Sequence, residues 1–329
     1  MENTSSLREL LNNDNPERNY PISFLGEGGE YFGVLIVNWL LTAITLGIYY
    51  PWAKARKLQF LFSATQFNGA RFVFHGTGNE MFKGFIKAIL IFVVLNALLA
   101  FFIWMQMPIV GIIIFYLCIL ALIPIAIHGS YKYRMSRTSW RSIRFGYRGD
   151  RKELVMLFLK NILLTIVTLG LYTPWLSMNL RNYILNRVKF GNLKFKYTGN
   201  GSEYFLLVLK GYLLSLVTLF IYMFWFQRNL LAYYIDNLSI ANEDGTEVKM
   251  KCTATGGDFF KLLMGNFFLL IFTLGIGYSW VVCRTIRFLF SHMEIYGNLD
   301  FDKLIQSEAN YTDATGEDLS DILDFGIVV

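Results

Sequence analysis

Lysine and asparagine recur at fixed distances from five acidic residues, and this pattern is the sequence feature most suited to chemistry. Three lysines follow an acid by seven positions, and three asparagines follow one by eight. The lysines are Lys87, Lys160 and Lys210, the asparagines are Asn38, Asn161 and Asn266, and the acids are Glu30, Glu80, Glu153, Glu203 and Asp258. On a helix, seven positions keep acid and lysine on one face, and a rise of about 1.5 Å per residue separates them by roughly 10 Å.

Each of these side chains has a functional and a structural interpretation. A lysine inside an apolar helix usually faces a bundle interior or a water-filled cavity and marks a pathway, which favours a polar seam for a small anionic solute or a lipid. The same lysine can instead reach the interface, or bond Asn and Thr of a neighbouring unit as structural glue. The acids precede apolar runs and are placed to cap the positive ends of helices.

A second candidate set consists of four arginines further along the chain. They are Arg56, Arg181, Arg228 and Arg284, each with Trp and Tyr nearby. The set could form an anion-binding ring around a repeat axis. It could equally be the positive flank of an aromatic belt that holds lipid headgroups.

The sequence offers no catalytic or metal-binding set. It has three cysteines and three histidines, and no two cysteines have a metal-ligand or redox spacing. No Ser-His-Asp, Cys-His or paired-carboxylate arrangement is evident. The Gly-x-Gly pairs lack the strand-helix-strand setting and the downstream acid of a nucleotide site. We therefore expect no catalytic residue, no metal and no cofactor, and we do not expect an enzyme.

Composition indicates a membrane protein. Of the 329 residues, 54% are hydrophobic and 16% are charged, whereas about a quarter are charged in a soluble domain. The mean hydropathy is +0.42. So much apolar surface cannot be hidden in one or two cores while enough charge remains to cover the outside. A lipid bilayer is the expected solvent.

Charge is distributed unevenly along the chain. Residues 1–30 hold two basic and six acidic side chains, and residues 298–329 hold one basic and eight acidic side chains. The segment between them holds 27 basic and 10 acidic side chains, a net charge of +17. These basic residues flank apolar runs, which predicts a multi-pass protein with cytoplasmic connectors and termini and does not favour nucleic-acid binding.

One sequence element recurs five times: a short aromatic strand, a glycine pair, an acid and an apolar helix. In four copies Thr lies 15 positions after the acid and Trp lies 22 after it. The expected divisions are a polar tail at 1–20, unit 1 at 21–66, unit 2 at 67–140, unit 3 at 141–190, unit 4 at 191–240, unit 5 at 241–296 and an acidic tail at 297–329. Unit 2 has a lengthened apolar run, which predicts two full spans.

Each unit is expected to be a helical hairpin. The first helices are expected at 31–46, 82–104, 154–169, 204–219 and 259–274. Gly47, Gly170 and Gly275 are expected to release the chain from the helix, and Pro51 and Pro174 to start the next helix. The predicted fold class is an all-α polytopic membrane protein of five hairpin units, joined by short amphipathic β-hairpins or strands on the cytoplasmic side. Second helices that are re-entrant or interfacial are the alternative.

Two motifs carry a resemblance to a known family. They are the Gly-x-Gly-x-Glu-Tyr-Phe start at residues 26–32 and the break from Thr45 to Trp52, and related copies run through residues 24–290. With these motifs the chain resembles the YjgN-type bacterial inner-membrane proteins, a family without an assigned biochemical activity. The resemblance implies the bacterial inner membrane as location. It supplies no catalytic residues, and the acidic tail lies outside the repeated pattern.

The leading functional hypothesis is a transporter- or channel-like protein for a small anionic solute or a lipid. The recurring Lys and Asn residues at equivalent depth motivate it. The alternative is a non-transporting membrane scaffold or lipid-organising protein, whose acidic tail recruits a protein partner. Membrane lipids are expected partners in either case, and a homo-oligomer is compatible with both.

Overall fold

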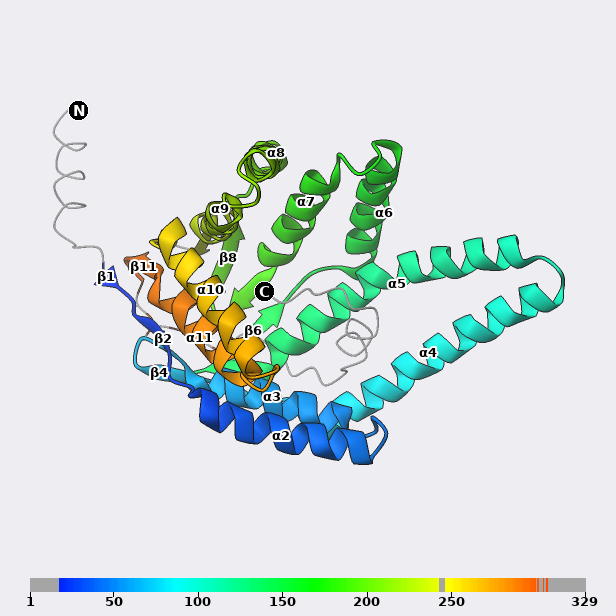
Figure 1. Cartoon of the computed structure of the whole chain (residues 1–329), viewed down its shortest axis with the longest axis horizontal. Helices are drawn as coiled ribbons and strands as arrows, with labels where there is room; N and C mark the ends of the chain where they lie inside the picture. Colours follow the sequence, from blue (N-terminus) through cyan, green and yellow to red (C-terminus); the bar gives the residue numbers. More distant parts are fainter. Residues whose placement is uncertain (1–17, 243–245, 300, 302–303, 305, 307–329) are drawn as a thin grey trace.

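Five pairs of helices make up most of the chain (Figure 1). The computed structural model describes residues 18–242, 246–299, 301, 304 and 306. The pairs are α2 (Gly28–Ile44) with α3 (Tyr50–Ala64), α4 (Gly78–Trp104) with α5 (Pro108–Arg137), α6 (Arg151–Val167) with α7 (Thr173–Leu185), α8 (Gly201–Val217) with α9 (Met223–Asp236), and α10 (Gly256–Phe272) with α11 (Tyr278–Ser291). Most of the two polar tails lies outside the described residues.

The strands between the helix pairs form a single antiparallel sheet of eleven strands within the described residues. They are β1 (Arg18–Asn19), β2 (Ile22–Phe24), β3 (Thr65–Phe67), β4 (Ala70–Phe74), β5 (Thr138–Trp140), β6 (Ile143–Tyr147), β7 (Val188–Phe190), β8 (Leu193–Tyr197), β9 (Leu238–Ala241), β10 (Glu247–Cys252) and β11 (Met293–Gly297). The protein is mostly helical, as expected, but the all-α class is corrected. The connectors do not stay separate, because each pairs with the next.

The sheet follows chain order and its two edges meet. Its order is β1-β11-β10-β9-β8-β7-β6-β5-β4-β3-β2, and the edge strands β1 and β2 are separated only by Tyr20 and Pro21. The Tyr20 N–H donates to the carbonyl of Ile295 at 2.8 Å, and the Pro21 carbonyl accepts the N–H of Asn68 at 2.8 Å. One short segment therefore joins the last strand to the third, and the strands form a ring.

Apolar side chains fill one face of this ring. Alternate residues of a strand point to the same face, and β3, β5 and β7 to β11 contribute one or two each to a buried cluster. The cluster comprises Tyr20, Phe67, Trp140, Phe190, Leu193, Ile240, Val248, Met250, Ile295, Leu299 and Phe301. Phe301 packs edge-on against Tyr20 and Phe67, with ring centroids 4.8 and 5.3 Å apart. The Tyr20 hydroxyl donates to the Leu299 carbonyl at 2.7 Å, so residues beyond β11 complete the core.

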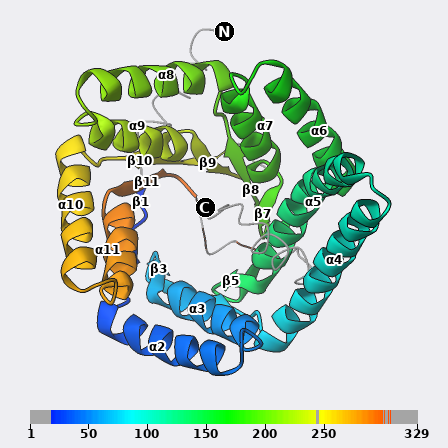
Figure 2. The same cartoon turned by 45° about the vertical axis from the view of Figure 1, so that its right-hand side comes forward.

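The helices form a second ring around the strands. Each helix packs against the next along the chain, and α11 packs against α2. Figure 2 shows α3, α5, α7, α9 and α11 on the inside of this ring and their partners on the outside. A tryptophan near the start of an inner helix packs on the first glycine of the next pair's outer helix. These contacts are Trp52 on Gly78, Trp175 on Gly201, Trp225 on Gly256 and Trp280 on Gly28.

Two helices have the length and composition of membrane spans among the described residues. These are α4 with 27 residues and α5 with 30, and their most apolar windows have mean hydropathies of 2.7 and 2.9. Only 11% and 17% of those windows are buried inside the protein. The core helix of a soluble protein would be mostly buried, so these helices present apolar surface to their surroundings.

The turn between the helices of a pair begins at a different residue from the glycine that the sequence predicted. In four pairs the first residue with positive φ is a leucine, with φ of 50°, and the expected Gly47, Gly170 and Gly275 follow it with φ of 91°, 91° and 88°. The leucines are Leu46, Leu169, Leu219 and Leu274. Because the N–H of Gly47 bonds the carbonyl of Thr42 and that of Leu46 bonds Ala43, the turn is a Schellman motif with leucine in the left-handed position.

The contact between Trp280 and Gly28 gives a direct test of ring closure. A Cβ at Gly28 would overlap the Trp280 indole, whereas a Cβ at the neighbouring Gly29 meets nothing within 4 Å. We expect Gly28→Ala to lower the free energy of unfolding by about 1–3 kcal/mol, as overpacking does. Gly29→Ala should be neutral or raise it by up to about 1 kcal/mol. Thermal unfolding in detergent compares the pair, and equal midpoints would exclude a role for this contact in stability.

Candidate functional site

The five acids lie in the first turn of the outer helices but do not act as the caps. Three of the helices are capped from three positions earlier, where the side chains of Thr77, Asp150 and Thr255 accept the N–H groups of Glu80, Glu153 and Asp258. The hydrogen-bonding cap of these helices is therefore another residue. An acid at the third helical position still complements the positive helix end, and Asp258 completes a capping box with Thr255. The N–H of Glu153 holds the pKa of the exposed Asp150 carboxyl below its usual range.

Two acids also tie the helices of a pair together near the sheet. Arg137 Nη2 lies 2.6 Å from Glu80 Oε1, and the Tyr133 hydroxyl donates to Glu80 Oε2 at 3.2 Å. In the next pair Arg187 Nη2 lies 2.9 Å from Glu153 Oε2. Each bond joins the start of one helix to the end of its partner, where a cation also complements the negative helix end. The sequence argument missed both arginines, although a basic residue at the end of α5 and another just after α7 were the available signals.

The other three acids are placed differently. Asp258 Oδ2 lies 3.9 Å from His292 Nε2, again across the ends of one helix pair. Glu203 is exposed in the first turn of α8. Glu30 lines a pocket between α2 and α3 together with Arg56. The shared position therefore does not give the five acids a shared partner.

The three asparagines are buried between the helices of their pairs. The Asn38 amide donates to the Ala53 carbonyl at 3.2 Å. Asn161 accepts from the Asn179 amide at 2.7 Å, and the Asn266 amide donates to the Thr285 hydroxyl at 3.1 Å. All three therefore join an outer helix to its inner partner, which is the structural-glue interpretation.

The three lysines do not share the asparagine face. Lys87, Lys160 and Lys210 are exposed on their helices, one position before the buried asparagines or their equivalents. The structure therefore does not bring lysine and asparagine together into one polar seam. Within the described residues, no three His, Cys, Asp or Glu side chains are grouped to hold a metal ion.

Three of the four candidate arginines line pockets between the helices of a pair. Arg56 lines a cavity of about 440 Å³ between α2 and α3. Arg228 lines one of about 430 Å³ between α8 and α9. Arg284 lines one of about 330 Å³ between α10 and α11. The pockets therefore recur at equivalent places around the ring, each with a guanidinium beside apolar walls.

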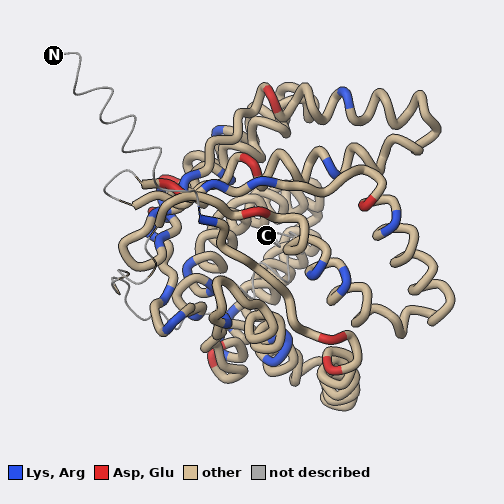
Figure 3. Tube along the Cα trace, turned by 90° about the vertical axis from the view of Figure 1, so that its left-hand side faces the viewer, with Lys and Arg blue, Asp and Glu red and all other residues tan. Residues whose placement is uncertain are grey.

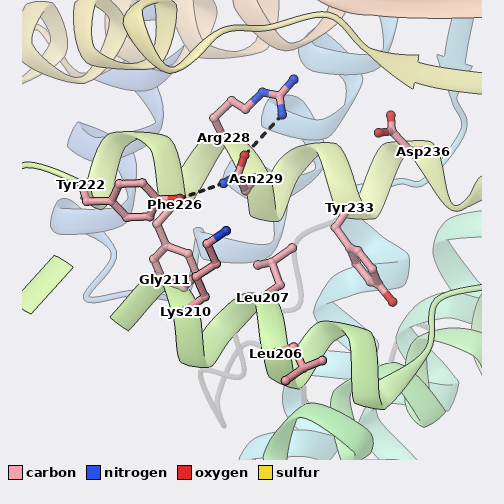
Figure 4. A pocket seen from close by; sticks show the side chains of 10 residues that line it. All are labelled: Leu206, Leu207, Lys210, Gly211, Tyr222, Phe226, Arg228, Asn229, Tyr233 and Asp236. Atoms are coloured by element: carbon pink, nitrogen blue, oxygen red, sulfur yellow. Dashed lines mark hydrogen bonds between the residues drawn. The ribbon is translucent and has the colours of Figure 1, made fainter. Parts of the chain in front are cut away.

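The pocket between α8 and α9 holds two cationic side chains from opposite helices (Figure 4). Lys210 comes from α8 and Arg228 from α9. The Arg228 Nε donates to the Ala254 carbonyl at 2.7 Å and its Nη1 to Asn229 Oδ1 at 3.3 Å. Leucine and phenylalanine side chains supply the apolar wall: Leu206, Leu207 and Phe226. Such a site offers charged hydrogen bonds to a phosphate or carboxylate and an apolar surface to an attached chain.

The fourth arginine has a different environment. The Arg181 guanidinium lies over the Tyr234 ring at 4.0 Å and within 5.8 Å of the Tyr197 centroid. It therefore bridges α7, α9 and β8 through cation–π contacts. Its surroundings therefore differ from those of Arg56, Arg228 and Arg284, which line pockets.

The inner helices are strongly basic as a group. Together α3, α5, α7, α9 and α11 carry ten Lys and Arg residues and one acid, Asp236. Figure 3 shows basic positions distributed along the helices and around the strands. Net positive charge of this kind attracts anions and anionic lipid headgroups.

Comparison with known proteins gives a family match over most of the chain. A family model described as "Bacterial protein of unknown function (DUF898)" matches residues 19–198, 192–244 and 237–322. Inner membrane protein YjgN of Salmonella typhimurium (strain LT2) is 32% identical over 130 residues, 40% of this chain and 32% of that protein. Inner membrane protein YjgN of Escherichia coli (strain K12) is 34% identical over 129 residues, 39% of this chain and 31% of that protein. The matches thus span about a third of these relatives, and no solved structure matches.

The two ion pairs differ in burial and should differ in their contribution to stability. The Arg137 and Glu80 side chains are 8% and 23% exposed, whereas Arg187 and Glu153 are 35% and 59% exposed. Breaking a buried pair costs about 3–5 kcal/mol, because one charge loses its partner. A surface pair contributes about 0–1 kcal/mol. We expect Glu80→Gln to lower the unfolding midpoint in detergent far more than Glu153→Gln, and the reverse order would contradict this assignment.

Proposed function

Because the chain belongs to the DUF898 family of bacterial proteins of unknown function, we propose that it is an integral inner-membrane protein that binds anionic lipid and moves it within the membrane. The expected resemblance to YjgN-type inner-membrane proteins is confirmed. The relatives' names give a location and no reaction. The activity is therefore argued from the chain's own pockets and charges.

The proposed location is the bacterial inner membrane, with the strand ring and both termini on the cytoplasmic side. The apolar and largely unburied α4 and α5 support insertion. The surplus of basic over acidic residues in the inner helices and strands supports the cytoplasmic side, since positive residues flank spans there. Multi-pass topology is part of the proposal.

The pocket between α8 and α9 is the observation that carries the proposed ligand. Lys210 and Arg228 are the cations of its polar lining, which also contains Asp236 and three uncharged polar side chains, and Leu206, Leu207 and Phe226 line its apolar part. A phosphate headgroup with an acyl chain matches both parts, because it offers an anion and an apolar tail. A small anionic solute matches only the cations, so the pocket favours a lipid.

Movement of lipid along the helix grooves does not require an open strand ring. The ring core contains Trp140, Leu193 and Val248, each 1% exposed or less, and Phe301 packs on it. A small anionic solute passing along the ring axis would have to displace this core. A lipid held between the helices of a pair remains in contact with the surrounding bilayer.

The second candidate function is a non-transporting scaffold that organises lipid. The filled ring core favours this function, because a tightly packed core makes the strand ring a rigid support. In this function the same pockets hold anionic lipid, and the acidic segment 297–329 recruits a basic partner. A homo-oligomer is compatible with both functions.

Removing pocket cations should weaken binding of anionic lipid. We expect the triple variant Arg56→Gln, Lys210→Gln, Arg284→Gln to lose at least about tenfold in affinity for phosphatidylglycerol, since a charged hydrogen bond contributes about 1.5–3 kcal/mol and 1.4 kcal/mol is tenfold. Native mass spectrometry of the purified protein measures the lipid retained. The control variant removes three cations from strands: Arg71→Gln, Lys249→Gln, Lys251→Gln. Equal loss in both variants would mean that general charge, and not the pockets, binds the lipid.

Lipid movement separates the two candidate functions. We expect proteoliposomes with the protein to expose inner-leaflet fluorescent phosphatidylglycerol to external dithionite faster than protein-free vesicles. The triple pocket variant should return the rate toward that of protein-free vesicles. A protein that retains phosphatidylglycerol in native mass spectrometry but leaves the dithionite rate unchanged would be a scaffold and would contradict transport.

A further inference from the structure

The turns of the four shorter helix pairs expose leucine in a strained backbone conformation. Leu46, Leu169, Leu219 and Leu274 each have φ of 50° and are 93%, 95%, 83% and 92% exposed. A left-handed residue with a branched side chain is sterically unfavourable, and glycine or asparagine is the usual choice there. In water an exposed leucine would add a second cost. In hydrocarbon that second cost disappears.

The same turns satisfy their backbone donors without water. From Thr45 to Tyr50 each N–H has an acceptor within the turn or the preceding helix. The same pattern covers 168–173, 218–223 and 273–278. The threonine at the start of each turn donates its hydroxyl to the carbonyl four residues earlier and accepts the N–H four residues later, as Thr45 does at 2.7 and 3.0 Å. Hydrocarbon requires complete pairing of this kind.

The charge-free stretches around these turns are too short for two crossings. They run over 31–53, 161–180, 211–227 and 262–283. The tip leucine of each pair lies eight to ten residues from the nearer charged end of its stretch. At about 1.5 Å per residue this is about 12–15 Å, whereas the hydrocarbon core is about 30 Å thick. Helix tilt only reduces this depth. These pairs therefore reach the middle of the bilayer and not its far side.

The α4–α5 pair differs in length and in the chemistry of its tip. Its charge-free stretch runs over 88–131 and gives α4 about 26 Å and α5 about 36 Å. Its left-handed turn residue is the polar Gln106, with φ of 60°, where the other pairs have leucine. Trp104 beside it is 79% exposed, and tryptophan is typical of the membrane–water interface.

We propose that the four shorter pairs are re-entrant hairpins whose leucine tips end among lipid acyl chains, and that α4 and α5 alone cross the bilayer. The four shorter pairs then lie in the leaflet nearest the strand ring. Only α4 and α5 pass through the other leaflet. Lipid acyl chains contact the exposed apolar surfaces of these tips. The inference rests on the inner-membrane location and is independent of which lipid the pockets bind.

Cysteine labelling on the full-length protein tests this topology. Cys118, Cys252 and Cys283 are first replaced by alanine, and single cysteines are placed by Leu46→Cys, Leu169→Cys, Gln106→Cys and Lys251→Cys. A membrane-impermeant maleimide is applied to spheroplasts and to inside-out vesicles. We expect Gln106→Cys to react from the outside and Lys251→Cys from the inside. The two tip variants should react from neither side and should react fully in detergent.

Two outcomes would overturn the proposal. Reaction of the tip variants from the same side as Gln106→Cys would show that every pair crosses. Reaction from the Lys251→Cys side would show that the tips lie in water. If a leucine variant does not accumulate, Ile48→Cys and Leu171→Cys, at exposed positions without positive φ, replace it. Bimane on a buried tip should be quenched by lipids brominated deep in the acyl chain. Neither labelling outcome changes the phosphatidylglycerol retention that the pockets are expected to give. The topology and the lipid-binding proposal can therefore fail separately.

Discussion

Closure between the first and last helix pairs is the constraint on which the remaining architecture depends. The segment 18–24 pairs with β11 on one side and β3 on the other, and Trp280 packs on Gly28. Tyr20 and Pro21 hold the two edge strands β1 and β2 next to each other, and exposed edges are sites of unwanted pairing. It also fixes which helix of each pair lies inside. Because the inner helices carry ten basic residues and one acid, the same closure places this net positive charge next to the strands.

The local structure was largely predictable because its signals are local. Fixed spacing from the acids predicted the helix pairs, and Gly47, Gly170 and Gly275 were expected in the turns, where all three have positive φ. The single sheet was not predictable from these signals. Pairing of Tyr147 with Val188 or of Arg18 with Gly297 joins residues that are distant in sequence, and short amphipathic strands do not specify their partners.

The sequence predicted the types of residue in the candidate site better than it predicted which of them lie together. Arg56, Arg228 and Arg284 share an equivalent pocket, but Arg181 does not, because tyrosines replace the pocket around it. The lysines and asparagines differ by one position in their spacing from the acids, and the sequence argument placed them in one set. On a helix one position is about 100°, which is enough to bury Asn161 between helices and leave Lys160 exposed.

The closed ring also orders events during biosynthesis. Arg18 emerges from the ribosome 279 residues before its partner Gly297. At a synthesis rate of about 5–20 residues per second, the interval is roughly 15–60 s. During that time β2 and β3 can pair, while β1 has no partner and the ring core has no Phe301. The helix pairs can therefore form before the ring closes, and ring closure is a late step of folding.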